Sequence, residues 1–450
     1  MKSSWFFLLF FCSGALWAQG GYEITVTLKP YKDQYIYLGH YFGKSYPIID
    51  SVKVDQQSRG VFKGKQPLQG GIYLIGFPNK SGFFEILVDK QQQFSVTADS
   101  ATLPNGVTYT NSLDNELFVG YQRMVAEKGM RINALREALK SAATKADSTR
   151  LIDSLNTLDP VLPTKLQQPT NREDSISAFR YYRDHFWDGV NFWDGRLAYT
   201  TFFEEKLDRY FNQLVTPHPD SVNKEMDYML GYASINPEMQ RFLLLRFINR
   251  YYTQRYMWED AVFVHLYEKY FSSKTYPWLS EQGKKTITDR AYSLMANILG
   301  TPATDIELPD STGRTVSLYA LQKQYTLVVF WDPTCGHCKE TLPKIDSVYT
   351  ARWKQDGVGI YAVAKETEGT RADWLRFIAE KKIGHWSHVY YSKETEKSRI
   401  EKNVPGYSQL YDVQSFPTLY LLDKDKRIIA KKLSYEQMDE IIQLKKKEKK

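Results

Sequence analysis

A largely apolar run, residues 325–331, lies three residues before the motif Cys335-Gly336-His337-Cys338. Runs so rich in β-branched and aromatic residues are typical of the buried central strand of a parallel sheet. After the second cysteine, apolar side chains recur at helical spacing, with Leu342 and Ile345 among them. The pattern therefore predicts a strand, a short turn and a helix, with both cysteines where the helix begins. A Cys-x-x-Cys in this position is typical of a redox-active dithiol.

The start of the chain has the pattern of a secretory signal peptide. Lys2 precedes an apolar stretch, residues 5–11, and small residues lead to Ala18. We expect residues 1–18 to be cleaved and the chain to be exported to the periplasm or cell envelope. Two alternatives are an uncleaved segment that anchors the chain in the membrane and a lipoprotein built on Cys12. The bulky phenylalanines before Cys12 count against the lipoprotein.

Composition narrows the function classes. A chain of 450 residues is too long for one compact core, so two or three domains are expected. The 59 Lys and Arg nearly balance the 52 Asp and Glu, and the dense basic run is confined to residues 445–450. No basic face or motif indicates a nucleic-acid partner. Signal removal leaves Cys335 and Cys338 of the three cysteines, so the pair is expected to be functional instead of part of a disulfide framework.

Three patterns follow one another along the chain. Residues 19–110 alternate apolar and polar side chains between Gly- and Pro-containing breaks, which predicts an all-β, sandwich-like domain, either an antiparallel sandwich or a small barrel. Residues 111–299 carry apolar side chains at helical spacing and predict an α-helical domain. Residues 300–450 alternate strands with helices and end in a strand hairpin, which predicts an α/β domain.

Two helical segments, residues 179–187 and 250–258, are rich in aromatic side chains and arginine. Tyr, Trp and Arg are common interface anchors, so one interpretation is a groove that holds an extended polypeptide. The alternative is that the rings pack between helices while the arginine stems cover them.

Several motifs in the last third occur together in one known family. They are the hairpin at residues 308–313, the strand that ends in Phe330-Trp331, the dithiol, Pro343, and Phe416-Pro417-Thr418. With them, residues 302–444 resemble a TlpA/ResA-like thiol-disulfide oxidoreductase of the thioredoxin superfamily. A helix-containing insertion, here residues 358–405, is typical of that family. The β-rich and helical parts are similar to modules that precede such domains in exported proteins of Bacteroidota.

The resemblance implies a thioredoxin fold and an enzyme of the protein-disulfide reductase or isomerase type. Its partners would be protein thiol and disulfide substrates and a membrane thiol-disulfide electron donor. It implies no organic cofactor and no metal. Cell redox homeostasis and cytochrome c maturation are both compatible with these residues. The alternative class is a protein- or glycan-binding protein whose thioredoxin-like domain senses redox state.

Different roles are expected for the residues of the dithiol motif. Cys335 lies at the predicted helix N-terminus, where backbone N–H groups and the helix dipole favour a thiolate, so it is expected to be the nucleophile. Cys338, one turn further in, is expected to resolve the mixed disulfide. Cys-Gly-His-Cys is the motif of protein disulfide isomerase, and by this likeness His337 stabilises the thiolate and raises the reduction potential. The alternative is an exposed histidine with little effect.

The resemblance assigns substrate binding to Phe416, Pro417 and Trp331. Pro417 is expected to follow a cis peptide bond, which leaves the backbone of Phe416 free to pair with an extended substrate. The alternative is an ordinary trans proline at the start of a strand.

This chain departs from the family pattern at two positions. Thr334 replaces the aromatic residue common before the first cysteine, and Val329 replaces the buried acid of ordinary thioredoxins. Proton transfer from Cys338 therefore needs another base. Glu366 is a candidate, because it corresponds loosely to an acid in ResA-like proteins; its alternative role is that of a solvated loop carboxylate.

A zinc site and a thiol peroxidase fit the cysteine pair less well than a redox dithiol does. Zinc needs a second ligand pair, and His385 and His388 lie in a segment without a matching motif. Peroxiredoxin-type thiol peroxidases resemble Pro-x-x-x-Thr-x-x-Cys, whereas Pro333, Thr334 and Cys335 are consecutive here.

Overall fold

The structure, a computed structural model, describes residues 20–448 except residues 104, 143 and 159–170. The predicted signal segment, residues 1–18, lies outside the described residues. The chain divides into two compact units. The first ends at Val215 and also includes Tyr228–Leu243, and the second comprises Thr216–Asp227 and Leu244–Lys450. Within the described part of the chain, every helix is too short or too polar to cross a bilayer.

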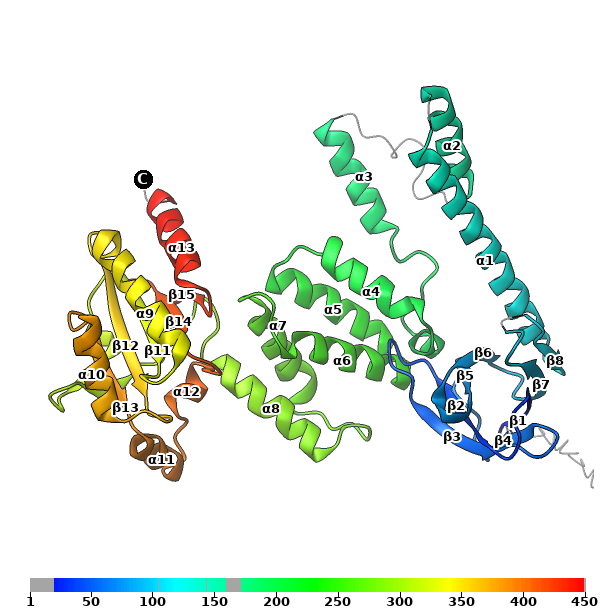
Figure 1. Cartoon of the computed structure of the whole chain (residues 1–450), viewed down its shortest axis with the longest axis horizontal. Coiled ribbons are helices and arrows are strands. Elements are labelled where there is room, and N and C mark those ends of the chain that lie inside the picture. The colour runs from blue at the N-terminus through cyan, green and yellow to red at the C-terminus, as the bar shows by residue number, and fades with distance from the viewer. Residues whose placement is uncertain (1–19, 104, 143, 159–170, 449–450) are drawn as a thin grey trace, which may run out of the picture. The chain divides into compact units, whose positions relative to one another are not determined.

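The N-terminal region is β-rich, as predicted, and forms two four-stranded sheets of order β4-β1-β7-β8 and β3-β2-β5-β6 (Figure 1). Alternate residues are buried, such as Ile24, Val26 and Leu28 in β1. The expectation of antiparallel pairing throughout is wrong for β1 and β7, which are parallel with Glu23 opposite Gln93. Parallel partners need a long connection and so leave no local turn signal. The strands are β1 (Glu23–Lys29), β2 (Tyr35–His40), β3 (Ile48–Lys53), β4 (Arg59–Lys63), β5 (Gly71–Gly76), β6 (Phe83–Val88), β7 (Gln93–Asp99) and β8 (Thr108–Thr110).

The region that follows is helical, which confirms the second predicted pattern. Its aromatic segments serve partly in packing, since Phe186 and Tyr251 are buried. Tyr256, however, is 61% exposed. The helices are α1 (Leu113–Lys140), α2 (Lys145–Leu158), α3 (Arg172–Asp184), α4 (Phe202–Gln213), α5 (Pro219–Ala233), α6 (Pro237–Tyr252), α7 (Glu259–Leu266) and α8 (Glu281–Met295).

The C-terminal region is an α/β domain with a thioredoxin-like mixed sheet of order β13-β12-β11-β14-β15. The central strand β11 is parallel to β12 and antiparallel to β14, and β15 closes the predicted hairpin. A short hairpin, β9 and β10, precedes the sheet. The elements are β9 (Glu307–Pro309), β10 (Thr315–Ser317), β11 (Tyr325–Trp331), α9 (Gly336–Val348), β12 (Val358–Lys365), α10 (Arg371–Lys381), β13 (Ser387–Tyr391), α11 (Lys393–Glu401), α12 (Tyr407–Leu410), β14 (Thr418–Leu422), β15 (Ile428–Lys431) and α13 (Tyr435–Glu448).

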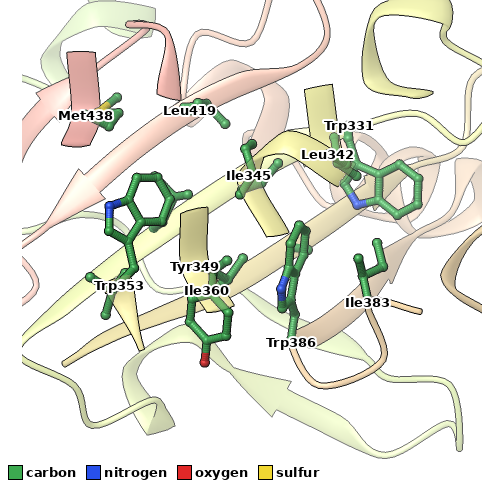
Figure 2. Packing of buried hydrophobic residues seen from close by; sticks show 14 of the residues in the cluster. Trp331, Leu342, Ile345, Tyr349, Trp353, Ile360, Ile383, Trp386, Leu419 and Met438 are labelled. Atoms are coloured by element: carbon green, nitrogen blue, oxygen red, sulfur yellow. The ribbon is translucent and has the colours of Figure 1, made fainter. Parts of the chain in front are cut away.

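The core of this domain lies on both faces of the sheet. All seven residues of β11 are buried, and successive side chains join different clusters. Val329 and Trp331 pack with Ile345 of α9, Trp353 and Met438 in the cluster shown in Figure 2. The side chains between them on β11 belong to a second cluster on the opposite face. A strand covered on both faces needs a continuous apolar run, which explains the sequence of residues 325–331.

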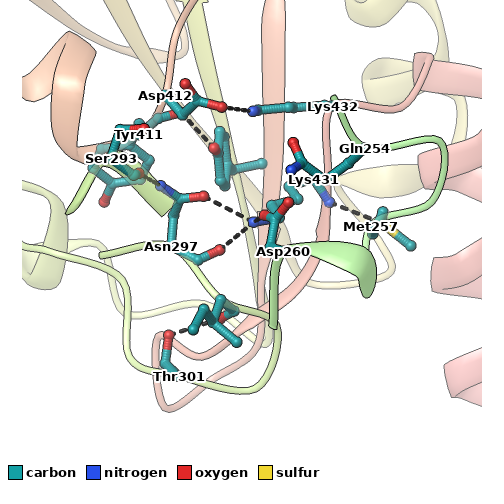
Figure 3. A network of polar contacts seen from close by, with 12 residues as sticks. Gln254, Met257, Asp260, Ser293, Asn297, Thr301, Tyr411, Asp412, Lys431 and Lys432 are labelled. Atoms are coloured by element: carbon teal, nitrogen blue, oxygen red, sulfur yellow. Dashed lines mark hydrogen bonds and ion pairs between the residues drawn. The ribbon is translucent and has the colours of Figure 1, made fainter. Parts of the chain in front are cut away.

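A buried polar network joins helices α7 and α8 to the edge strand β15 within the second unit (Figure 3). The ammonium group of Lys431 pairs with the carboxylate of Asp260 on α7. It also donates to the backbone oxygen and Oδ1 of Asn297, at 2.5 and 2.8 Å. All three residues are at most 3% exposed. The lysine is therefore fully satisfied, and its partners fix the two helices to this edge of the sheet.

Removing one member of this network tests its contribution. We expect Asp260→Ala to lower the free energy of unfolding by about 3–5 kcal/mol, because it leaves the ammonium group of Lys431 buried without its counter-ion. Equilibrium urea unfolding measures the change. As a control, Asp289→Ala removes an exposed ion pair with Lys285 and should cost below about 1 kcal/mol. Equal losses in the two variants would contradict the role of the network.

Candidate functional site

The dithiol lies at the end of β11, and one aspartate shapes the turn that presents it. Asp332 follows the strand directly, and its backbone oxygen accepts a hydrogen bond from Cys335 N at 3.2 Å. Its Oδ1 accepts hydrogen bonds from the backbone N–H, at 2.6 Å, and the hydroxyl of Thr334. Cys335 is the N-cap residue of α9. The turn is therefore held by the side chain of Asp332, and it places the first cysteine at the helix N-terminus.

The two thiols differ in access. Cys338 is fully buried, whereas Cys335 is partly exposed. Cys335 Sγ donates to the backbone oxygen of Phe416 at 3.5 Å, and the peptide bond between Phe416 and Pro417 is cis, as predicted. The structure thus brings Phe416 and Pro417 next to the accessible sulfur.

Cys338 is surrounded by groups that disfavour its thiolate. Burial raises the pKa of Cys338 well above its usual range, and the thiol of Cys335 and the carboxyl group of Asp332 raise it further. A hydrogen bond with the backbone of Asp332 acts in the opposite direction. Cys338 is therefore a thiol at neutral pH, and it needs a proton acceptor before it can act as a nucleophile.

Asp332 is a functional candidate that the sequence patterns did not single out. Its side chain is only 2% exposed, and its Oδ2 is buried with no hydrogen-bond partner among the described residues. Buried carboxylate oxygens are normally paired, so an open one on a group that raises the pKa of Cys338 calls for a chemical explanation. The available signal was an acid directly after a buried strand and three residues before the first cysteine.

The remaining predicted site residues differ in exposure. Assigning Trp331 to substrate binding is wrong, because its ring is fully buried and packs against Phe377 at 4.9 Å between ring centres. His337 is exposed in the first turn of α9. Glu366 is partly exposed; it follows β12 and accepts a hydrogen bond from the backbone of Lys393 at 3.1 Å.

Tyr390 connects Glu366 with the dithiol region. Burial, together with the nearby carboxylates of Glu366 and Asp332, raises the pKa of Tyr390 to about 12. Tyr390 shares a core cluster with Cys338 on one face of the sheet. Its hydroxyl is therefore a neutral group within electrostatic reach of both acids.

The two histidines considered as metal ligands have other partners. His388 is buried, and its Nε2 bonds to the backbone oxygen of Ile383 at 2.8 Å. His385 lies 2.8 Å from a carboxylate oxygen of Asp346. In the described part of the chain, no group of three or more His, Cys, Asp or Glu is placed to hold a metal ion.

Two family models match different parts of this chain. Residues 299–431 match the model of the AhpC/TSA family, and residues 131–297 match a domain of unknown function, DUF5106. A thioredoxin-like protein of Haemophilus influenzae is 31% identical over 122 residues, which is 27% of this chain and 62% of that relative, less than two thirds of its length.

Two solved structures are similar to parts of this chain. A thioredoxin-like protein from Bacteroides caccae has a TM-score of 0.47 and 20% identity, covering 63% of this chain and 96% of that one. A domain of a possible thiol-disulfide isomerase from Cytophaga hutchinsonii has a TM-score of 0.29 and 36% identity, covering 34% of this chain and 95% of that one.

The difference between the thiols predicts selective alkylation. In the folded, reduced protein at neutral pH, iodoacetamide should modify Cys335 and leave Cys338 unmodified, because Cys338 is buried and its pKa is raised. Mass spectrometry of proteolytic fragments locates the label. Unfolding in urea serves as the control and should make both thiols reactive. Equal labelling of both cysteines in the folded chain would contradict the assignment.

Proposed function

Because residues 299–431 form a thioredoxin-like domain of the AhpC/TSA family, we propose that this chain is an exported thiol-disulfide oxidoreductase acting on protein substrates. The observation that carries the proposal is the unequal access of the two sulfurs. Cys335 is accessible beside Phe416, and Cys338 is sealed one turn behind it. This arrangement suits a nucleophile and a resolving thiol. The H. influenzae relative, named thioredoxin-like, is consistent with this chemistry.

The first step is attack of the Cys335 thiolate on one sulfur of a substrate disulfide. A bond forms between Cys335 Sγ and that sulfur, the substrate S–S bond breaks, and the other substrate sulfur leaves as a thiolate. Cys335 is the N-cap residue of α9, and in our proposal His337, exposed in the same turn, modulates its reactivity.

The second step resolves the mixed disulfide. Cys338 transfers its proton to the open Oδ2 of Asp332 and attacks Cys335 Sγ, so the substrate leaves as its second thiolate. The substrate gains two electrons, and Cys335 and Cys338 are left joined as a disulfide. An external dithiol, in our proposal a membrane thiol-disulfide donor, returns the pair to the reduced state.

The proton taken up by Asp332 needs a route to solvent. Tyr390 lies within electrostatic reach of both Asp332 and Glu366, and Glu366 is partly exposed. We therefore keep a role for Glu366 as the outer group that passes the proton to water. In our proposal the direct base is Asp332, whose carboxyl group acts electrostatically on Cys338, and not Glu366.

Trapping of the mixed disulfide tests the proposal. We expect Cys338→Ala to accumulate disulfides between Cys335 and exported proteins, because the resolving thiol is absent. Non-reducing electrophoresis followed by mass spectrometry identifies the adducts. The double variant that also carries Cys335→Ala is the control and should give none. If Cys338→Ala traps no protein, the enzyme proposal fails and a redox-sensing protein- or glycan-binding function becomes the better explanation.

Asp332→Asn tests the proton transfer. We expect the mixed disulfide of this variant to be resolved roughly 10²-fold more slowly at neutral pH, because the internal base is lost. Its resolution rate should also rise more steeply with pH than that of the wild type, since only hydroxide then ionises Cys338. Quenched-flow alkylation with mass spectrometry measures both. Asp425→Asn, at an exposed aspartate, is the matched control. Unchanged kinetics in Asp332→Asn would rule out the acceptor role.

A further inference from the structure

The segment between α6 and α7, residues 253–258, is called here the aromatic loop. It is tied to the thioredoxin-like domain at two points, and Figure 3 shows the one between Met257 and Lys431. The backbone N–H of Lys431 donates to Met257 Sδ at 3.3 Å. Arg290 donates both to Gln254 Oε1, at 2.5 Å, and to Asp412 Oδ1, at 2.7 Å. The aromatic loop therefore has a fixed position on this domain within the second unit.

The aromatic loop lies at the end of the sheet that carries the dithiol. Thr418 of β14 pairs with Phe330 near the end of β11. The backbone N–H of Lys432, directly after β15, donates to Leu419 O at 2.7 Å. The last residue of β15 therefore lies beside the first residues of β14. Lys431 is the last residue of β15 and contacts the loop. The loop therefore lies beside this end of the sheet's outer strand.

The spacing between the outer strand β15 and β11 suits a bound chain. Neighbouring strands lie about 4.8 Å apart, so the edge of β15 is roughly 10 Å from β11. An extended chain covers that distance in about three residues. A polypeptide attached to Cys335 and passing over Phe416 would reach the aromatic loop within that length.

The loop presents an aromatic surface that packing does not require. Tyr256 is 61% exposed, whereas the nearby Tyr251 is only 4% exposed. The ring of Tyr256 stacks on Trp258, with ring centres 6.2 Å apart and planes inclined by 3°. Aromatic rings on a fixed support lose little conformational freedom on binding and are frequent anchors of interfaces.

We infer that the aromatic loop binds the extended polypeptide that flanks the substrate's reactive cysteine, through an apolar or aromatic side chain about three residues from it. This inference rests on the proposed function. The occupant follows from the position of the loop, because a chain joined to Cys335 by a mixed disulfide crosses this end of the sheet. A small disulfide would not reach it. The upstream helical segment thereby contributes to substrate choice.

Two disulfide probes separate recognition from chemistry. One is a short synthetic peptide with phenylalanine about three residues from its single cysteine, which is joined to glutathione. The other is 5,5′-dithiobis(2-nitrobenzoate), which lacks a flanking chain. With reduced full-length protein, we expect Tyr256→Ala to react roughly tenfold more slowly with the peptide, as for loss of an interface anchor, and at the wild-type rate with the small disulfide. Stopped-flow fluorescence and absorbance give the two rates.

Matched variants complete the test. Tyr256→Phe keeps the ring and should keep the peptide rate, and Tyr292→Ala removes a tyrosine of similar exposure, 59%, on α8 without effect. A peptide with serine in place of phenylalanine should react with wild type and Tyr256→Ala at equal rates. Equal slowing of Tyr256→Ala with both disulfides, or none with either, would overturn the inference. Wild-type protein inactive on both probes would instead overturn the proposed function, and with it this role of the loop.

Discussion

Complete burial of β11 on both faces of the sheet is the constraint from which the site follows. Its seven buried residues are held between parallel β12 and antiparallel β14, so the position where the strand ends is fixed. The chain must then turn at Asp332 and enter α9 at Cys335. The same pairing brings the start of β14, and with it Pro417, to the accessible sulfur. A helix N-terminus alone would not position a second strand beside the thiol.

The buried side chains of Lys431 and Asp332 differ in how completely they are hydrogen-bonded. For this reason we assign a structural role to Lys431 and a chemical role to Asp332. The ammonium group of Lys431 has three oxygen partners from Asp260 and Asn297 and holds two helices against the sheet. The carboxyl group of Asp332 is equally buried but keeps one oxygen without a partner among the described residues. Leaving a buried polar atom open costs free energy, and the carboxyl group also acts electrostatically on Cys338, which is consistent with a role in proton transfer.

Local patterns were sufficient for much of the fold because strands and helices impose their own periods on the sequence. Residues 325–331 and the helix after them were predicted correctly for that reason. The parallel pairing of β1 and β7 was not predicted. Glu23 and Gln93 lie opposite each other, but the long connection between them carries no local sequence pattern. Trp331 was misassigned because an aromatic residue near a dithiol can face substrate or core. Only the order of the sheet decides which.

By itself, the sequence determined the dithiol, its place between a strand and a helix, and the proline before a late strand. These depend on spacing and local preference, which neighbouring residues carry. The tertiary structure alone decided that the ring of Trp331 is buried against Phe377 and is not open to a substrate. It also decided that Met257 meets Lys431 across 174 positions of chain. Such contacts follow from strand order and side-chain packing between distant segments, and no local pattern encodes them.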